Sequence, residues 1–219
     1  MHDLYSFVSG PLVWVSFIIF IGGSMIKLFS MYQLAKQKDS IVFVYFSPKF
    51  AFRSIIRWLT PFGTVNMQKQ PIMTVVTFVF HICLILVPIF LYAHIILFKE
   101  SFDISWIYLP DTVADIGTVL VVLCCGYFLY RRVALPEVQY LTSASDFVLL
   151  VVVAAPFITG FWTYHQLPGY NFASILHILA GEIMLAAIPF TRLSHMFFFP
   201  VTRGYIGSEF GGVRHVNDW

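Results

Sequence analysis

The residues best suited to chemistry in this chain are two histidines in the apolar stretch HILAGEIMLAAIPFTRLSH. His177 and His195 are eighteen residues apart, so one unbroken α-helix would present both imidazoles on the same face, about 27 Å apart along its axis. A second apolar segment carries His81 and His94. Neutral imidazole is a common metal ligand, and ionisable groups within a membrane usually have a function. The four histidines are therefore candidate metal ligands.

The composition predicts an integral membrane protein. Of the 219 residues, 59% are apolar and only 11% are charged, and the mean hydropathy is +0.82. These values lie outside the range of soluble globular proteins. The net charge of +2 gives no support for a nucleic-acid partner. The cysteines, Cys83, Cys124 and Cys125, lie in apolar segments without CxxC spacing, which favours inert buried thiols over metal ligation.

Five segments are long and apolar enough to cross a bilayer, which predicts an all-α, polytopic membrane protein with one transmembrane domain over residues 1–219. The predicted spans are about 10–30, 71–98, 112–130, 147–166 and 172–198. A basic connection, 31–70, follows the first span. Within it Lys49, Arg53 and Arg57 recur every fourth residue, which favours a helix lying in the membrane interface, with docking of a cytoplasmic subunit as the alternative.

The distribution of Lys and Arg predicts the orientation. With five spans and the N-terminus outside, 12 of the 13 basic residues lie on the inner side or at the inner ends of spans, and only Lys99 lies outside. By the positive-inside rule we expect the chain to lie in the cell inner (cytoplasmic) membrane, with its N-terminus outside and its C-terminus on the cytoplasmic side.

This orientation pairs the histidines by depth. His81 and His195 would lie near the inner face, and His94 and His177 near the outer face. Two antiparallel helices with one histidine per leaflet match the axial ligands of two stacked haems, so the hypothesis is His81 and His195 on an inner haem iron and His94 and His177 on an outer one. The thirteen residues from His81 to His94 would rotate the side chains about 140° apart on an ideal helix, and Pro88 could unwind part of that difference.

Other polar residues near the histidines have open roles. Arg192 could pair with haem propionates or extend to lipid headgroups. Glu182, five residues after His177, is a candidate proton carrier, and His165 is a rival ligand at the outer edge.

The run Pro189, Phe190, Thr191, Arg192, Leu193, Ser194, His195 resembles the end of the gamma subunit family of respiratory nitrate reductase, a dihaem cytochrome b. The wider histidine spacing in the second span and the long basic loop suggest similarity to the membrane cytochrome b subunits of the Tmc and Dsr complexes of sulfate reducers, or of heterodisulfide reductase. The resemblance implies two haem b groups, a cytoplasmic iron–sulfur subunit of heterodisulfide-reductase type and, in some relatives, a periplasmic multihaem cytochrome c. No residue identifies a menaquinone site.

We therefore expect an electron-transfer subunit of a respiratory redox complex, active in sulfate respiration, rather than a stand-alone enzyme. Electrons would cross the membrane between a periplasmic cytochrome c or a menaquinone pool and the cytoplasmic iron–sulfur subunit. The alternative is a haem-free membrane anchor or a proton-relaying transporter subunit, whose histidines would bridge helices or carry protons.

Overall fold

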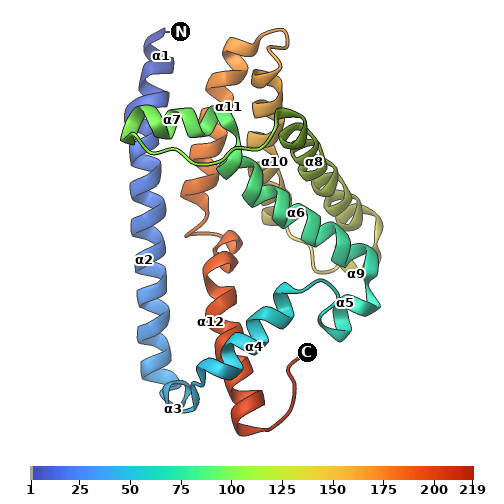
Figure 1. Ribbon diagram of the computed structural model, residues 1–219. Helices are drawn as coiled ribbons and strands as arrows, with labels where there is room; N and C mark the ends of the chain where they lie inside the picture. Colours follow the sequence, from blue (N-terminus) through green and yellow to red (C-terminus); the bar gives the residue numbers. More distant parts are fainter. Residues whose placement is uncertain (1) are drawn as a thin grey trace. The chain divides into compact units, whose positions relative to one another are not determined.

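A computed structural model describes residues 2–219, whose regular elements are all helices, with no β-strand among them (Figure 1). Within these residues, five helices are long and apolar enough to cross a membrane: Asp3–Lys38, Pro71–Phe90, Asp111–Ala134, Ala144–Tyr164 and Tyr170–Ala187. The predicted fold class, with five membrane-spanning helices, is confirmed. The chain is a multi-pass membrane protein.

The first span is longer than the predicted 10–30. It comprises α1 (His2–Phe7), a π-helical turn (Val8–Leu12) and α2 (Val13–Lys38). Pro11 lies in the π-helical turn, where its missing N–H explains the local change in hydrogen-bond pattern. Beyond this turn the helix runs on through Lys36 and Lys38, which were expected in the connecting loop.

The chain folds into two compact units. The first contains residues 2–9 and Val75–Met184, and the second contains Gly10–Thr74 and Leu185–Trp219. The four histidines are divided between the units, because His81, His94 and His177 belong to the first and His195 to the second.

The first unit is a helix bundle that includes most of α6 (Pro71–Phe90) and α11 (Tyr170–Ala187), together with α7 (Tyr92–Phe102), α8 (Asp111–Ala134), α9 (Pro136–Gln139) and α10 (Ala144–Tyr164). Helices α8 and α10 lie side by side (Figure 1). Each carries a buried valine, Val121 on α8 and Val153 on α10.

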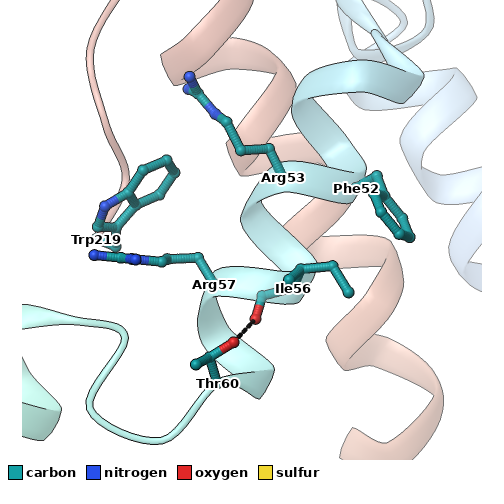
Figure 2. Close-up of a pocket in the computed structure, with 6 residues that line it drawn as sticks. All are labelled: Phe52, Arg53, Ile56, Arg57, Thr60 and Trp219. Carbon is teal, nitrogen blue, oxygen red and sulfur yellow. Dashed lines mark hydrogen bonds between the residues drawn. The ribbon is translucent and has the colours of Figure 1, made fainter.

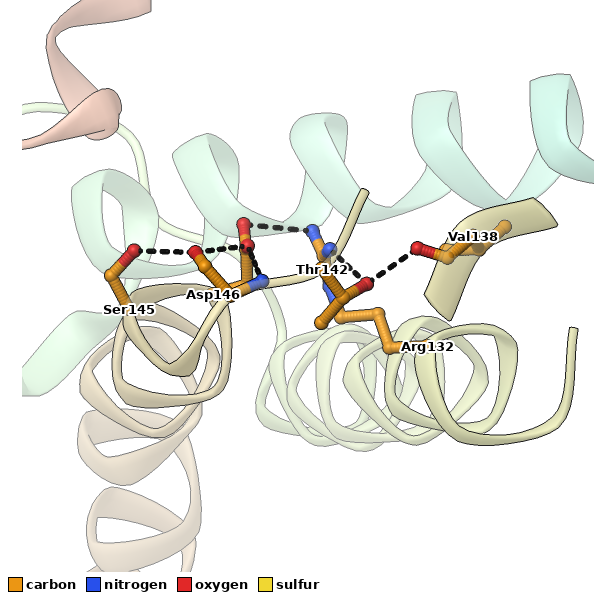
Figure 3. Close-up of polar contacts among 6 residues, drawn as sticks. Arg132, Val138, Thr142, Ser145 and Asp146 are labelled. Atoms are coloured by element: carbon orange, nitrogen blue, oxygen red, sulfur yellow. Dashed lines mark hydrogen bonds and ion pairs between the residues drawn. The ribbon is translucent and has the colours of Figure 1, made fainter. Parts of the chain in front are cut away.

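One ion pair joins the ends of α8 and α10. Arg132 Nη2 lies 3.5 Å from Asp146 Oδ1, and Arg132 also donates to the Thr142 hydroxyl (Figure 3). Asp146 completes a capping box with Ser143, which satisfies free N–H groups at the start of α10. Because Asp146 is buried, this pair holds the short connection between the two spans in one geometry.

The second unit contains α2, the whole of the basic connection and the C-terminal segment. Its short helices are α3 (Ile41–Tyr45), α4 (Pro48–Leu59), α5 (Val65–Lys69) and α12 (His195–Ser208), with a 3-10 turn (Arg192–Ser194) before α12 and a π-helical turn (Glu209–Val213) after it. Helix α4 packs closely on α12, since a Cβ at Gly207 would lie 2.4 Å from Ser54 Cβ. Ser54 is fully buried in this contact.

Two of the predicted spans end early. The interpretation of 71–98 as one helix is wrong, because α6 ends at Phe90 and Leu91 is extended, with ψ of 127°. The interpretation of 172–198 as one helix is also wrong, because α11 ends at Ala187. Pro189 explains the second break, since it cannot donate a backbone hydrogen bond and disfavours a helical residue before it. His177 and His195 therefore do not share a helix face.

Candidate functional site

The break after Phe90 is the feature that positions His94. The last carbonyls of a helix have no partner within it. At the end of α6 each of the last four is satisfied from beyond the helix: Val87 O by the Leu91 N–H at 2.9 Å, Pro88 O by His94 Nδ1 at 2.8 Å, Ile89 O by Trp106 Nε1 at 2.8 Å and Phe90 O by the Leu109 N–H at 2.9 Å. The His94 ring is therefore fixed over the end of α6, in the first turn of α7.

His177 is held in a similar way by another helix. It projects from α11, and its Nδ1 lies 2.9 Å from Pro156 O of α10. Gly160, one turn further along α10, makes room for the ring, because a Cβ there would lie 2.8 Å from His177 Cε1. A carbonyl can only accept, so the proton of both His94 and His177 is on Nδ1, and Nε2 remains the basic nitrogen.

The His94 and His177 rings lie close to each other within the first unit. Their centres are 6.0 Å apart and their planes differ by only 13°. Two metal–nitrogen bonds of about 2 Å, with each ring centre about 1 Å behind its nitrogen, would place the ring centres about 6 Å apart. Histidine ligands commonly donate their other ring N–H to a backbone carbonyl, as both do here. The distance between the ring centres and the tautomer therefore match two axial ligands on one metal, while the convergence of the two Nε2 atoms on that metal is a prediction.

The donor set indicates which kind of metal centre the pair would suit. Within residues 2–219, no group of three or more His, Cys, Asp or Glu side chains could hold a metal ion. Haem iron needs only two protein ligands, because the macrocycle supplies the other four. A Cβ added at Gly181, one turn after His177, would meet no atom within 4 Å. The residues present therefore fit a bis-histidine haem better than a zinc site.

The histidines of the predicted inner pair, His81 and His195, are described one at a time because they belong to different units. His81 Nδ1 lies 2.8 Å from Thr77 O, and the His81 ring packs edge-on against Phe80. His195, at the start of α12, is exposed, and its Nδ1 lies 2.9 Å from Arg192 O. Both histidines thus make the same kind of Nδ1 contact as the outer pair. They belong to different units, so the pairing of His81 with His195 stays a prediction.

Three other predicted residues can now be placed. The side chain of Arg192 is exposed. His165 Nε2 lies 3.0 Å from Asp115 Oδ1, so this histidine joins the ends of α10 and α8. Glu182 is only 7% exposed, and both of its carboxylate oxygens are buried with no hydrogen-bond partner among residues 2–219. Such a carboxyl is costly within a membrane, and its role stays a hypothesis.

Three residues that support the outer pair did not stand out in the sequence. Pro156 had no assigned role, whereas its carbonyl is the partner of His177. Gly160 and Trp106 had no assigned role, although the first accommodates His177 and the second caps α6 next to His94. The Pro156–Gly160 spacing of one helical turn places both residues on one face, and this was the available signal.

Comparison with known proteins identifies one relative. A protein of Nitratidesulfovibrio vulgaris strain Hildenborough, described simply as "Protein", is 37% identical over 215 residues, which cover 96% of this chain and 95% of the relative. No protein-family model matches the chain. No solved structure matches it either.

Proposed function

This chain belongs to the same protein family as the Nitratidesulfovibrio vulgaris relative, and we propose that it is a dihaem b-type cytochrome, the membrane subunit of a respiratory redox complex. The parallel, carbonyl-bound imidazoles of His94 and His177 are the observation that carries the proposal. The chain would transfer electrons between the outer face of the inner membrane, or a menaquinone pool, and a cytoplasmic partner. The proposed partners are an iron–sulfur subunit of heterodisulfide-reductase type and a periplasmic multihaem cytochrome c.

In this function the protein has a positioning role. A haem supplies one-electron chemistry when bound, and the chain fixes its place and surroundings. His94 and His177 provide the axial nitrogens, while Pro88 O and Pro156 O fix the tautomer and orientation of the two rings. The buried Ile95, which follows His94, would contribute to an apolar surrounding for this haem. His81 and His195 would hold the inner haem, with Arg192 available for its propionates.

One observation favours the alternative of a haem-free anchor. The Nδ1 contact of His94 satisfies a carbonyl at the end of α6, and the contact of His177 joins α11 to α10. These are structural roles that need no cofactor. A distance of 6.0 Å between nearly parallel rings also lies within the range of offset ring stacking, so the haem content of the protein has to distinguish the two functions.

The proposal is tested by the reduced-minus-oxidised absorption spectrum and the haem content of the purified full-length protein. We expect a b-type alpha band and two haems per chain. His94→Ala and His177→Ala should each remove the same haem and leave the other. His165→Ala is the matched control, because this histidine lies at the outer end of the same unit but is paired with Asp115, and the variant should keep both haems. Wild-type protein without an alpha band would rule the function out.

A further inference from the structure

A pair of arginines on α4 lies in a place where a membrane-bound anion can reach it. The first span ends at Lys38, and α3 and α4 follow it along the chain after two short connections. On α4, Arg53 and Arg57 are one helical turn apart and both are exposed. Residues four apart lie on the same helix face, so their guanidinium groups are neighbours.

The two arginines line a shallow pocket with an aromatic wall. Its volume is about 360 Å³, and its lining residues are Phe52, Arg53, Ile56, Arg57, Thr60 and Trp219. The guanidinium carbons of Arg53 and Arg57 lie 4.9 and 5.6 Å from the centre of the Trp219 ring. Figure 2 shows the two side chains extending from α4 on the side of Trp219, with Phe52 on the opposite side of the helix. Contact with the indole restricts both guanidinium groups, which lowers the entropic cost of binding a ligand.

The positive charge of this pocket is not balanced by carboxylates. Within residues 2–219, neither Arg53 nor Arg57 forms an ion pair with an acidic side chain. Asp218 precedes Trp219, but its side chain is 2% exposed and interacts with Ser54 and Arg203 instead. Two adjacent guanidinium groups without a counter-ion favour a phosphate group, which they can bind through paired N–H donors.

The surrounding surface indicates the source of that phosphate. The helix that carries the arginines also has exposed apolar side chains, among them Phe52 at 66% exposure and Leu59 at 56%. A soluble anion would leave these side chains in water, whereas a lipid would cover them with its acyl chains. The combination of a basic pocket and an apolar rim next to the end of a span is typical of headgroup recognition.

We propose that Arg53, Arg57 and Trp219 form a binding site for the headgroup of an anionic phospholipid such as phosphatidylglycerol. The phosphodiester lies between the two guanidinium groups, and the acyl chains run along the apolar side of α4. This inference is independent of the haem function, because it concerns a different surface and a different ligand. It is more specific than an interfacial position for α4, since it requires a preference for headgroup charge at defined residues.

The test titrates the purified full-length protein in detergent with dioleoyl phosphatidylglycerol or dioleoyl phosphatidylcholine and counts bound lipids by native mass spectrometry. We expect a preference for phosphatidylglycerol, and a loss of about tenfold or more in its affinity in the double variant Arg53→Gln, Arg57→Gln. The matched control is Lys36→Gln, Lys38→Gln, which removes the same charge from the exposed end of α2 and should keep the preference. Unchanged thermal melting shows that each variant is folded.

Three results would overturn the proposal. Equal binding of the two lipids would show that headgroup charge is not recognised. Wild-type affinity in the arginine variant would place the lipid elsewhere. Displacement of phosphatidylglycerol by an equal concentration of inorganic phosphate would show that the pocket binds free phosphate. Should the arginine variant fail to fold, the single variant Trp219→Phe, which keeps both charges and an aromatic ring, is expected to bind phosphatidylglycerol as the wild type does, whereas Trp219→Ala should weaken binding.

Discussion

Gly160 is the residue on which the position of the His177 ring most directly depends. A Cβ at this position would lie 2.8 Å from His177 Cε1 and 3.0 Å from its Nδ1. In Gly160→Ala the ring must therefore move away from α10 and lose its contact with Pro156 O. We expect one of the two haems to lose bis-histidine ligation or to be absent, measured as a decrease in low-spin signal in the electron paramagnetic resonance spectrum and in haem content.

Gly126→Ala is the matched control for this change. Gly126 lies within α8, and a Cβ there would meet no atom within 4 Å. We expect both haems to be retained in this variant, with stability unchanged or slightly raised, because alanine favours helix over glycine by up to about 1 kcal/mol. A Gly160→Ala protein with the haem signals of the wild type would show that the ring position is not set by Gly160.

The proximity of His94 and His177 could be predicted from sequence, but their supporting contacts could not. Matching His94 with His177 required only the count of spans and the depth of each residue. The carbonyl partners, Pro88 O and Pro156 O, depend on where α6 ends and on which face of α10 meets α11. The end of α6 and the contact face of α10 are consequences of tertiary packing, which the preferences of single residues do not predict.

At the scale of elements, the ends of the helices were harder to predict than their existence. Hydropathy and length identify a span because about twenty apolar residues are needed to cross the bilayer. They do not separate a kink from a break, so Pro88 was interpreted as a local distortion and 172–198 as one helix running through Pro189. Helix α6 continues for two residues past Pro88 and ends where backbone and side-chain donors from beyond the helix satisfy its last carbonyls. Helix α11, by contrast, ends two residues before Pro189.

The adjacent glycines of α2 give a test of how closely this helix packs. A Cβ at Gly23 would lie 2.9 Å from Pro189 Cγ and 3.1 Å from Phe190 Cζ, whereas one at Gly22 would meet no atom within 4 Å. We expect Gly23→Ala to destabilise the protein by about 1–3 kcal/mol, because α2 must move away from the segment that follows α11. Gly22→Ala should be neutral or slightly stabilising. Thermal unfolding in detergent measures both, and equal melting temperatures would contradict the close contact.

For the whole molecule, fold class and membrane character were predictable because they depend on composition summed over long segments. The five spans correspond to the predicted ones, although their ends differ. The division into two compact units was not predicted, since it depends on contacts between residues far apart in the sequence, such as those of α4 with α12. The proposed electron transfer across the membrane also depends on the orientation of the chain in the bilayer.

The orientation can be predicted from charge alone and tested without any cofactor. With five spans the two ends of the chain lie on opposite sides, and an outside N-terminus leaves Lys99 as the only basic residue on the outer side. In sealed spheroplasts we expect Ser101→Cys, in the exposed end of α7, to react with a membrane-impermeant maleimide. Ser40→Cys, in the exposed connection after α2, should react only after permeabilisation, and the wild type, whose three cysteines lie within spans, measures the background. The reverse labelling pattern would place the His94 and His177 pair near the cytoplasm. The proposed outer haem would then be next to the proposed iron–sulfur partner instead of the proposed periplasmic cytochrome.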